Sequence, residues 1–112
     1  MVLLAIGLLA AAPPAARGRV ALTISGGVSL GNYEAGLTWV IIRYLRIAAN
    51  RTELAAVTGA SAGATNAFLA AAMWCADENV DADPDTNLFH DLWAPVGLDD
   101  LLPEGSAAQI AL

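Results

Sequence analysis

The sequence predicts an α/β fold in which helices flank a parallel sheet. Short apolar segments typical of strands alternate along the chain with segments of helical periodicity, in the order β-α-β-α. A glycine-rich turn directly follows each predicted strand. Hydrophobic residues make up 57% of the 112 residues, which excludes a disordered chain. Strands that alternate with helices pair in parallel through right-handed crossovers, so we expect helices to cover the sheet.

The first predicted strand covers residues 20–25, because this short run is rich in β-branched residues and Gly26 closes it. A helix is predicted from about residue 33 to 49, where apolar residues recur at steps of three and four. The face predicted to be buried is Leu37, Val40, Ile41, Tyr44, Leu45 and Ala48.

A second short strand is predicted over residues 53–58, and a second helix over residues 62–74 after another glycine turn. An acidic surface loop over residues 77–87 follows. A short amphipathic helix is predicted over residues 88–93, with Phe89, Leu92 and Trp93 facing inward, and a further helical turn over residues 98–102. Two strands are few for a sheet of this class, so we expect the domain to be incomplete within these 112 residues.

The N-terminal segment allows two interpretations. Residues 1–12 are continuously apolar but too short to span a bilayer as a helix. Their length suits the core of a signal peptide, yet no basic residue precedes them and Pro13 follows the alanine run. Residues 1–18 are therefore either a signal peptide of a periplasmic, outer-membrane-associated or secreted protein, or a disordered extension of a cytoplasmic one. Residues 19–112 belong to the domain.

Charge and composition limit the partners of the chain. The formal net charge of −6 excludes nucleic-acid binding, which needs a basic face, and leaves only hydrophobic contact with a membrane as a peripheral possibility. Cys75, the single cysteine, has no disulfide partner, and we expect it to pack as a small hydrophobic residue. No cofactor and no metal site is expected, and the oligomeric state is not indicated by the sequence.

The second glycine turn has the pattern of a nucleophile elbow. Gly59, Ser61 and Gly63 form a G-x-S-x-G sequence between a predicted strand and a predicted helix. On such a turn the serine hydroxyl points away from the backbone, and the glycines keep the strand and the helix from colliding. The following helix directs amide groups at a developing oxyanion. The alternative is that Ser61 is only the N-cap of the helix.

The first glycine turn, residues 25–31, also joins a strand to a helix. It does not fit a dinucleotide-binding loop, because Val28 stands where that loop needs its second glycine. It does not fit a phosphate-binding P-loop either, because Asn32 and Tyr33 follow Gly31 in place of Lys and Ser or Thr. Ligands gather at the carboxyl ends of parallel strands, so the backbone N–H groups of this turn are placed to complete an oxyanion hole.

Together the two turns, SGGVSLGNYEAG at residues 25–36 and GASAG at residues 59–63, resemble the start of the patatin-like phospholipase family. The resemblance covers residues 19–76 and implies the N-terminal part of a three-layer α/β/α domain. It implies a serine lipid acyl hydrolase that cleaves acyl esters with a Ser–Asp dyad. Ser61 would be the nucleophile, flanked by the elbow glycines Gly59 and Gly63. The backbone of Gly26, Gly27 and Val28 would form the oxyanion hole.

The sequence departs from the family in three places. Val28 replaces a third glycine, Leu30 replaces an arginine, and the Asp-Gly motif that carries the dyad aspartate does not occur in these residues. The resemblance therefore places the aspartate outside this chain, and the chain alone is expected to be inactive. The alternative function is a non-catalytic α/β module that binds lipid or a partner.

Other polar residues give weaker signals. Asp81, Asp83 and Asp85 alternate as in a calcium loop, but the required glycine and bidentate glutamate are missing, so a solvated acidic loop is expected. His90, the only histidine, lies on a short helix and is expected to be a surface residue. None of the aspartates of the chain lies in a context like the family's Asp-Gly motif, so none is assigned as the base.

Overall fold

The computed structural model describes residues 16–76, 82–101 and 104. The elements are β1 (Gly18–Ile24), the 3-10 helix η1 (Val28–Leu30), α1 (Gly31–Ile47), β2 (Thr52–Gly59), α2 (Ala62–Cys75), α3 (Leu88–Trp93) and α4 (Leu98–Leu101). The predicted β-α-β-α order is confirmed, with boundaries shifted by a few residues. Nearly all of the N-terminal segment and half of the acidic loop lie outside the described residues.

β1 and β2 form a parallel two-stranded sheet. The pairing runs from Gly18 opposite Thr52 to Ile24 opposite Gly59, with one irregularity between Val20 and Ala21 that leaves one residue of β2 unpaired. Because both strands point the same way, they end side by side. The two glycine turns that follow them therefore start at the same edge of the sheet, as the sequence predicted.

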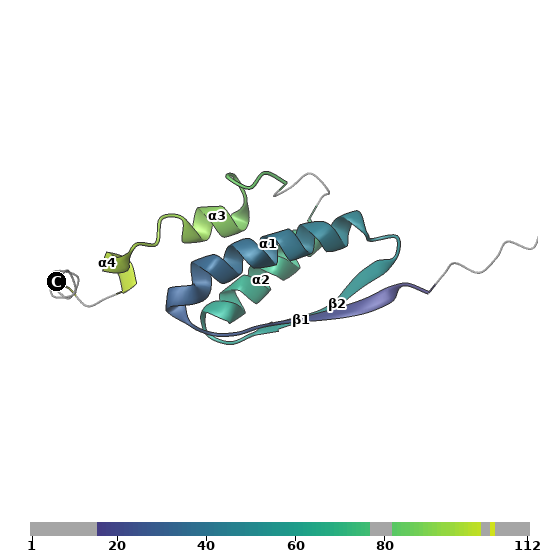
Figure 1. Cartoon of the computed structure of the whole chain (residues 1–112), viewed down its shortest axis with the longest axis horizontal. Helices are drawn as coiled ribbons and strands as arrows, with labels where there is room; N and C mark the ends of the chain where they lie inside the picture. Colours follow the sequence, from purple (N-terminus) through teal and green to yellow (C-terminus); the bar gives the residue numbers. More distant parts are fainter. Residues whose placement is uncertain (1–15, 77–81, 102–103, 105–112) are drawn as a thin grey trace, which may run out of the picture.

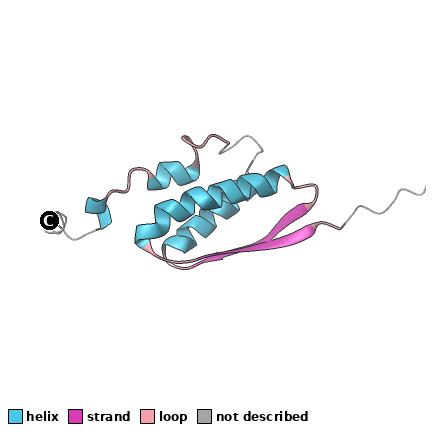
Figure 2. Ribbon diagram, viewed as in Figure 1, coloured by secondary structure: helices cyan, strands magenta, loops and turns pink. Residues whose placement is uncertain are grey.

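Both long helices lie on the same side of the strands (Figure 2). The burial of β1 agrees with this, since Leu22 packs against the helical core and Ile24 is buried, whereas Ala21 and Thr23 are exposed. α3 lies over the helices on the side away from the sheet (Figure 1). The chain is thus a small α/β unit of two parallel strands with flanking helices, and within the described residues no helix covers the second face of the sheet.

The core is small and rich in alanine. It joins α1, α2 and α3, with Ile42, Ala70 and Met73 completely buried. Small side chains on α2 let α1 pack closely against it, while each contributes little apolar area. The buried core cluster is Ala35, Ile42, Ala62, Leu69, Ala70, Met73, Phe89 and Trp93.

The predicted buried face of the first helix is wrong in three positions. Leu37, Val40 and Tyr44 are 51%, 53% and 69% exposed, whereas the buried side chains are Ala35, Thr38, Ile42 and Leu45. Two of these four are small, so hydropathy alone gave them little weight. α1 thus buries a face that combines small residues with Ile42 and Leu45, and leaves Leu37, Val40 and Tyr44 outside.

Two smaller expectations also fail. Cys75 is exposed at the end of α2 and does not pack as a core hydrophobe. Leu92 is 43% exposed, so only Phe89 and Trp93 anchor α3 to the core. None of the helices in the described part of the chain is long and apolar enough to cross a membrane.

Candidate functional site

Ser61 occupies the sharp turn between β2 and α2. Its backbone angles are φ 54° and ψ −128°, and it is the only non-glycine residue with positive φ among those described. A side chain in such a conformation costs about 1–3 kcal/mol and persists only where the surroundings impose it. Such strain is typical of the nucleophile elbow, where the turn lifts the serine hydroxyl out of the backbone.

The two flanking glycines are required by close packing. A Cβ on Gly59 would collide with the carbonyl of Gly63 and lie 2.8 Å from the amide nitrogen of Ala64. A Cβ on Gly63 would collide with the carbonyl of Ser25 and lie 2.6 Å from that of Ile24. The end of β2, the first turn of α2 and the end of β1 thus meet at contact distance, which forces the chain through the strained angles at Ser61.

Ser61 stands at the N-cap position of α2, but its side chain caps nothing. Its hydroxyl makes no hydrogen bond to any described residue, and the residue is exposed. An N-cap serine normally accepts a bond from an amide of the first turn, and its backbone lies in the extended region at negative φ. The N-cap alternative therefore accounts for neither the backbone angles nor the free hydroxyl.

The first glycine turn lies directly beside Ser61. A Cβ on Gly26 would be 3.2 Å from the Cβ of Ser61 and 2.8 Å from the carbonyl oxygen of Ala60. Gly27, the next residue, has a φ of 143°, which side chains rarely adopt. The structure thus brings together the residues that the sequence analysis selected from two separate segments.

Several backbone amides of the two glycine turns have no acceptor within the described residues. They belong to Gly26, Gly27 and Val28 of the first turn and to Ala62, the first residue of α2. Those of Leu30 and Gly31, by contrast, bond back to the turn at Gly27 and Val28. Unpaired N–H groups at a helix start and an adjacent loop are the donors that an oxyanion hole uses.

A buried amide network fixes the helices behind the turns. Asn66 of α2 is fully buried; its Nδ2 donates to the carbonyl oxygen of Gly31 at 3.1 Å, and its Oδ1 accepts from Trp93 Nε1 at 2.8 Å. A Cβ on Gly31 would collide with the Trp93 ring. Asn66 therefore connects α2, the start of α1 and α3 at one point, close to the first glycine turn.

Neither Asn66 nor Glu34 was predicted from the sequence to be a site residue. A lone asparagine within the apolar run of α2 is the signal that could have revealed the first. Glu34 accepts a short hydrogen bond at Oε1 from the Ser25 hydroxyl, but an acidic residue in the first turn of a helix is common for electrostatic reasons alone.

The described aspartates make their contacts away from Ser61. Asp83 accepts from the amide of Asp85, and Asp100 accepts from the amide of Gly97. Asp91 lies 3.6 Å from His90, whose side chain is 43% exposed, as expected of a surface residue. Asp81 of the calcium-like pattern lies outside the described residues, and the described part of the chain contains no cluster of three or more metal-binding side chains.

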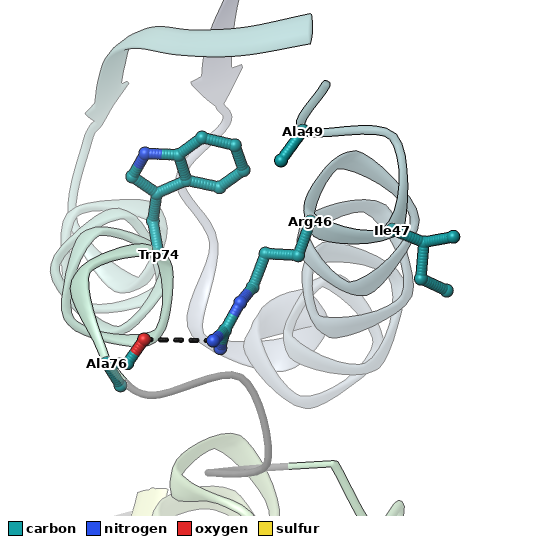
Figure 3. Close-up of a pocket in the computed structure, with 5 residues that line it drawn as sticks. All are labelled: Arg46, Ile47, Ala49, Trp74 and Ala76. Carbon is teal, nitrogen blue, oxygen red and sulfur yellow. Dashed lines mark hydrogen bonds between the residues drawn. The ribbon is translucent and has the colours of Figure 1, made fainter. Parts of the chain in front are cut away.

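A pocket of about 410 Å³ lies at the other end of the helices (Figure 3). Arg46 extends from α1 toward the end of α2 and donates to the carbonyl oxygens of Met73 and Ala76, each at 2.9 Å. These bonds cap the C-terminus of α2 and occupy the guanidinium. Trp74 forms the opposite wall. At 1.5 Å per residue this pocket is roughly 20 Å along α2 from Ser61, so it belongs to a different part of the molecule.

Comparisons with known protein families, with curated proteins and with solved structures found no match.

Proposed function

We propose that this chain carries the nucleophile and the oxyanion hole of a serine acyl-ester hydrolase of the patatin-like class. The observation that carries the proposal is the backbone of Ser61, which has φ 54° at a strand-to-helix turn between two glycines that tolerate no side chain. Ser61 is exposed, and its hydroxyl bonds to none of the residues that the structure describes. A purely structural turn would place glycine at such angles, because glycine adopts them without strain.

In the proposed reaction, Ser61 Oγ attacks the carbonyl carbon of an acyl ester and gives up its proton to a general base. The carbonyl oxygen becomes negative and is held by the N–H groups of Gly26, Gly27, Val28 and Ala62. The C–O bond to the alcohol then breaks, and the alcohol leaves with the proton. Water releases the acid from the acyl-serine by the same steps in reverse order.

We propose an aspartate outside these residues as the base, because Asp83, Asp91 and Asp100 make their contacts with groups other than Ser61. The proposal includes the three-layer α/β/α domain, in which a second helical layer covers the face of the sheet that carries Ala21 and Thr23. Parallel sheets are normally covered on both faces, which supports this arrangement. The substrate class is a lipid or another acyl ester, with no cofactor.

The direct test is ester hydrolysis by the full-length protein. We expect it to hydrolyse a short-chain aryl ester, and Ser61→Ala to reduce kcat to background without loss of folding. Thr65→Ala, which removes an exposed hydroxyl one turn further along α2, is the matched control and should retain activity. Unchanged hydrolysis in Ser61→Ala would refute the proposal.

The alternative function, a non-catalytic module that binds lipid or a partner, is favoured by one surface. α1 exposes apolar side chains at alternating steps of four and three, which is the spacing of a helix that packs against another helix. These side chains are Tyr33, Leu37, Val40, Tyr44 and Ile47. A folded full-length protein with no esterase activity, in which Leu37→Glu and Tyr44→Glu abolish partner or lipid binding, would establish this alternative.

A further inference from the structure

Glu34 lies in the first turn of α1, next to the first glycine turn. Its Oε1 accepts a short hydrogen bond from the hydroxyl of Ser25, the residue that immediately precedes Gly26. The carbonyl of Ser25 in turn lies where any side chain on Gly63 would have to go. Ser25 is thus in contact with the nucleophile elbow on one side and with Glu34 on the other.

The environment of the second carboxylate oxygen of Glu34 does not suit a residue that only complements the dipole of α1. Oε2 is shielded from solvent and has no hydrogen-bond partner among the described residues. Glu34 lines a small hollow of about 160 Å³ between β1 and α1, whose walls also include Leu22 and Leu37. A glutamate that only complements the helix dipole would keep both oxygens in water, since a buried polar atom without a hydrogen-bond partner is destabilising.

A glycine turn needs hydrogen bonds that fix its ends if its amides are to hold an oxyanion. The donors must lie about 2.7–3.1 Å from the oxyanion, and glycine gives the backbone the freedom to leave that geometry. After the turn, the bond from Leu30 N–H to the Gly27 carbonyl and the bond from Asn66 to Gly31 hold the chain. Before the turn, the side-chain bond between Ser25 and Glu34 holds it.

We infer that Glu34 is a positioning residue for the oxyanion hole, acting through Ser25 on the amides of Gly26 and Gly27. The inference rests on the function proposed for Ser61. Glu34 takes no proton in this role, so the side chain needs an acceptor oxygen of the right length and does not need a charge. Glutamine supplies that oxygen, whereas leucine of similar volume does not.

The kinetic test uses the full-length protein and four variants. Glu34→Gln should keep kcat within about threefold, and Glu34→Leu and Ser25→Ala should each lower it about 10- to 100-fold with KM within about twofold, because the lost interaction acts on the transition state. The double variant Ser25→Ala/Glu34→Leu should be no worse than the poorer single variant, since both remove one contact. Unchanged kcat in Glu34→Leu, or an equal loss in Glu34→Gln, would overturn the inference.

Amide hydrogen exchange separates this inference from the function on which it rests. Glu34→Leu should speed exchange of the Leu30, Gly31 and Ala60 amides, which bond around the two turns, while Glu34→Gln leaves their rates within about twofold. Failure of the unaltered protein to hydrolyse any ester would refute the proposed function. Unchanged exchange rates of these three amides in Glu34→Leu would refute the positioning role, whatever the esterase result.

Discussion

The backbone of Ser61 connects local strain to proposed chemistry. Its positive φ is imposed by three segments that meet at contact distance, at Gly59, Gly63 and Gly26. The strain is therefore a property of the fold around the turn, and the serine side chain does nothing to relieve it, because it makes no hydrogen bond to the described residues. A strained residue whose side chain does not stabilise the turn is expected where that side chain is needed for function.

Replacing Ser61 by glycine should stabilise the protein relative to Ser61→Ala. Glycine adopts φ 54° without strain, whereas alanine does not. We expect the strain energy that glycine avoids to exceed, by about 1 kcal/mol, the cost of its larger conformational entropy in the unfolded chain. Denaturant unfolding of the two variants measures the difference. Equal stability would mean that the turn relaxes around any residue, and that Ser61 is not held under strain.

The elbow glycine Gly63 should not tolerate a methyl group. Gly63→Ala places Cβ against the carbonyls of Ile24 and Ser25, so we expect a loss of at least about 2–3 kcal/mol in the free energy of unfolding. Gly36→Ala is the matched control, because Gly36 lies inside α1 with nothing within 4 Å of the added carbon. That variant should gain about 0.5–1 kcal/mol from helix propensity. Similar stability changes in the two variants would contradict the packing described here.

At the scale of elements, the β1-α1-β2-α2 unit is held by contacts from opposite ends of the two helices. Asn66 joins α2 to the start of α1 and to Trp93 of α3, whereas Arg46 joins the end of α1 to the end of α2. The first contact lies near Ser61 and the second lies at the far end of the helices. Sequence periodicity predicted the helices themselves but neither of these contacts, because each depends on which residues of two helices meet in space.

Removing the Asn66 side chain should cost stability well beyond an ordinary surface change. Asn66→Ala leaves the Trp93 indole N–H buried without its acceptor, which costs about 1–3 kcal/mol, and removes the bond that Asn66 donates to the Gly31 carbonyl. Thr65→Ala, on the exposed side of the same helix, should change stability by less than about 0.5 kcal/mol. Thermal or denaturant unfolding checks both variants. A loss below 1 kcal/mol in Asn66→Ala would show that water replaces the network.

Across the whole molecule, local signals predicted the element order and both glycine turns, and parallel pairing placed the turns together. The prediction of buried residues failed where tertiary packing, and not hydropathy, determines which face of a helix is buried. Hydropathy favoured Leu37, Val40 and Tyr44 for the interior, but α1 turns the face with the small residues Ala35 and Thr38 inward and leaves those three side chains exposed. The Ser25–Glu34 bond was also beyond sequence reasoning, since it depends on how the turn places a serine hydroxyl against the next helix.

If Ser61 is an activated nucleophile beside an oxyanion hole, as we propose, it should react covalently with a serine-directed probe. The full-length protein is incubated with a fluorophosphonate probe and digested, and the modified peptide is identified by mass spectrometry. We expect one modification, at Ser61, which disappears in Ser61→Ala and persists in the control Thr65→Ala. A folded protein that remains unlabelled, or a label on another residue with Ser61 unmodified, would contradict it.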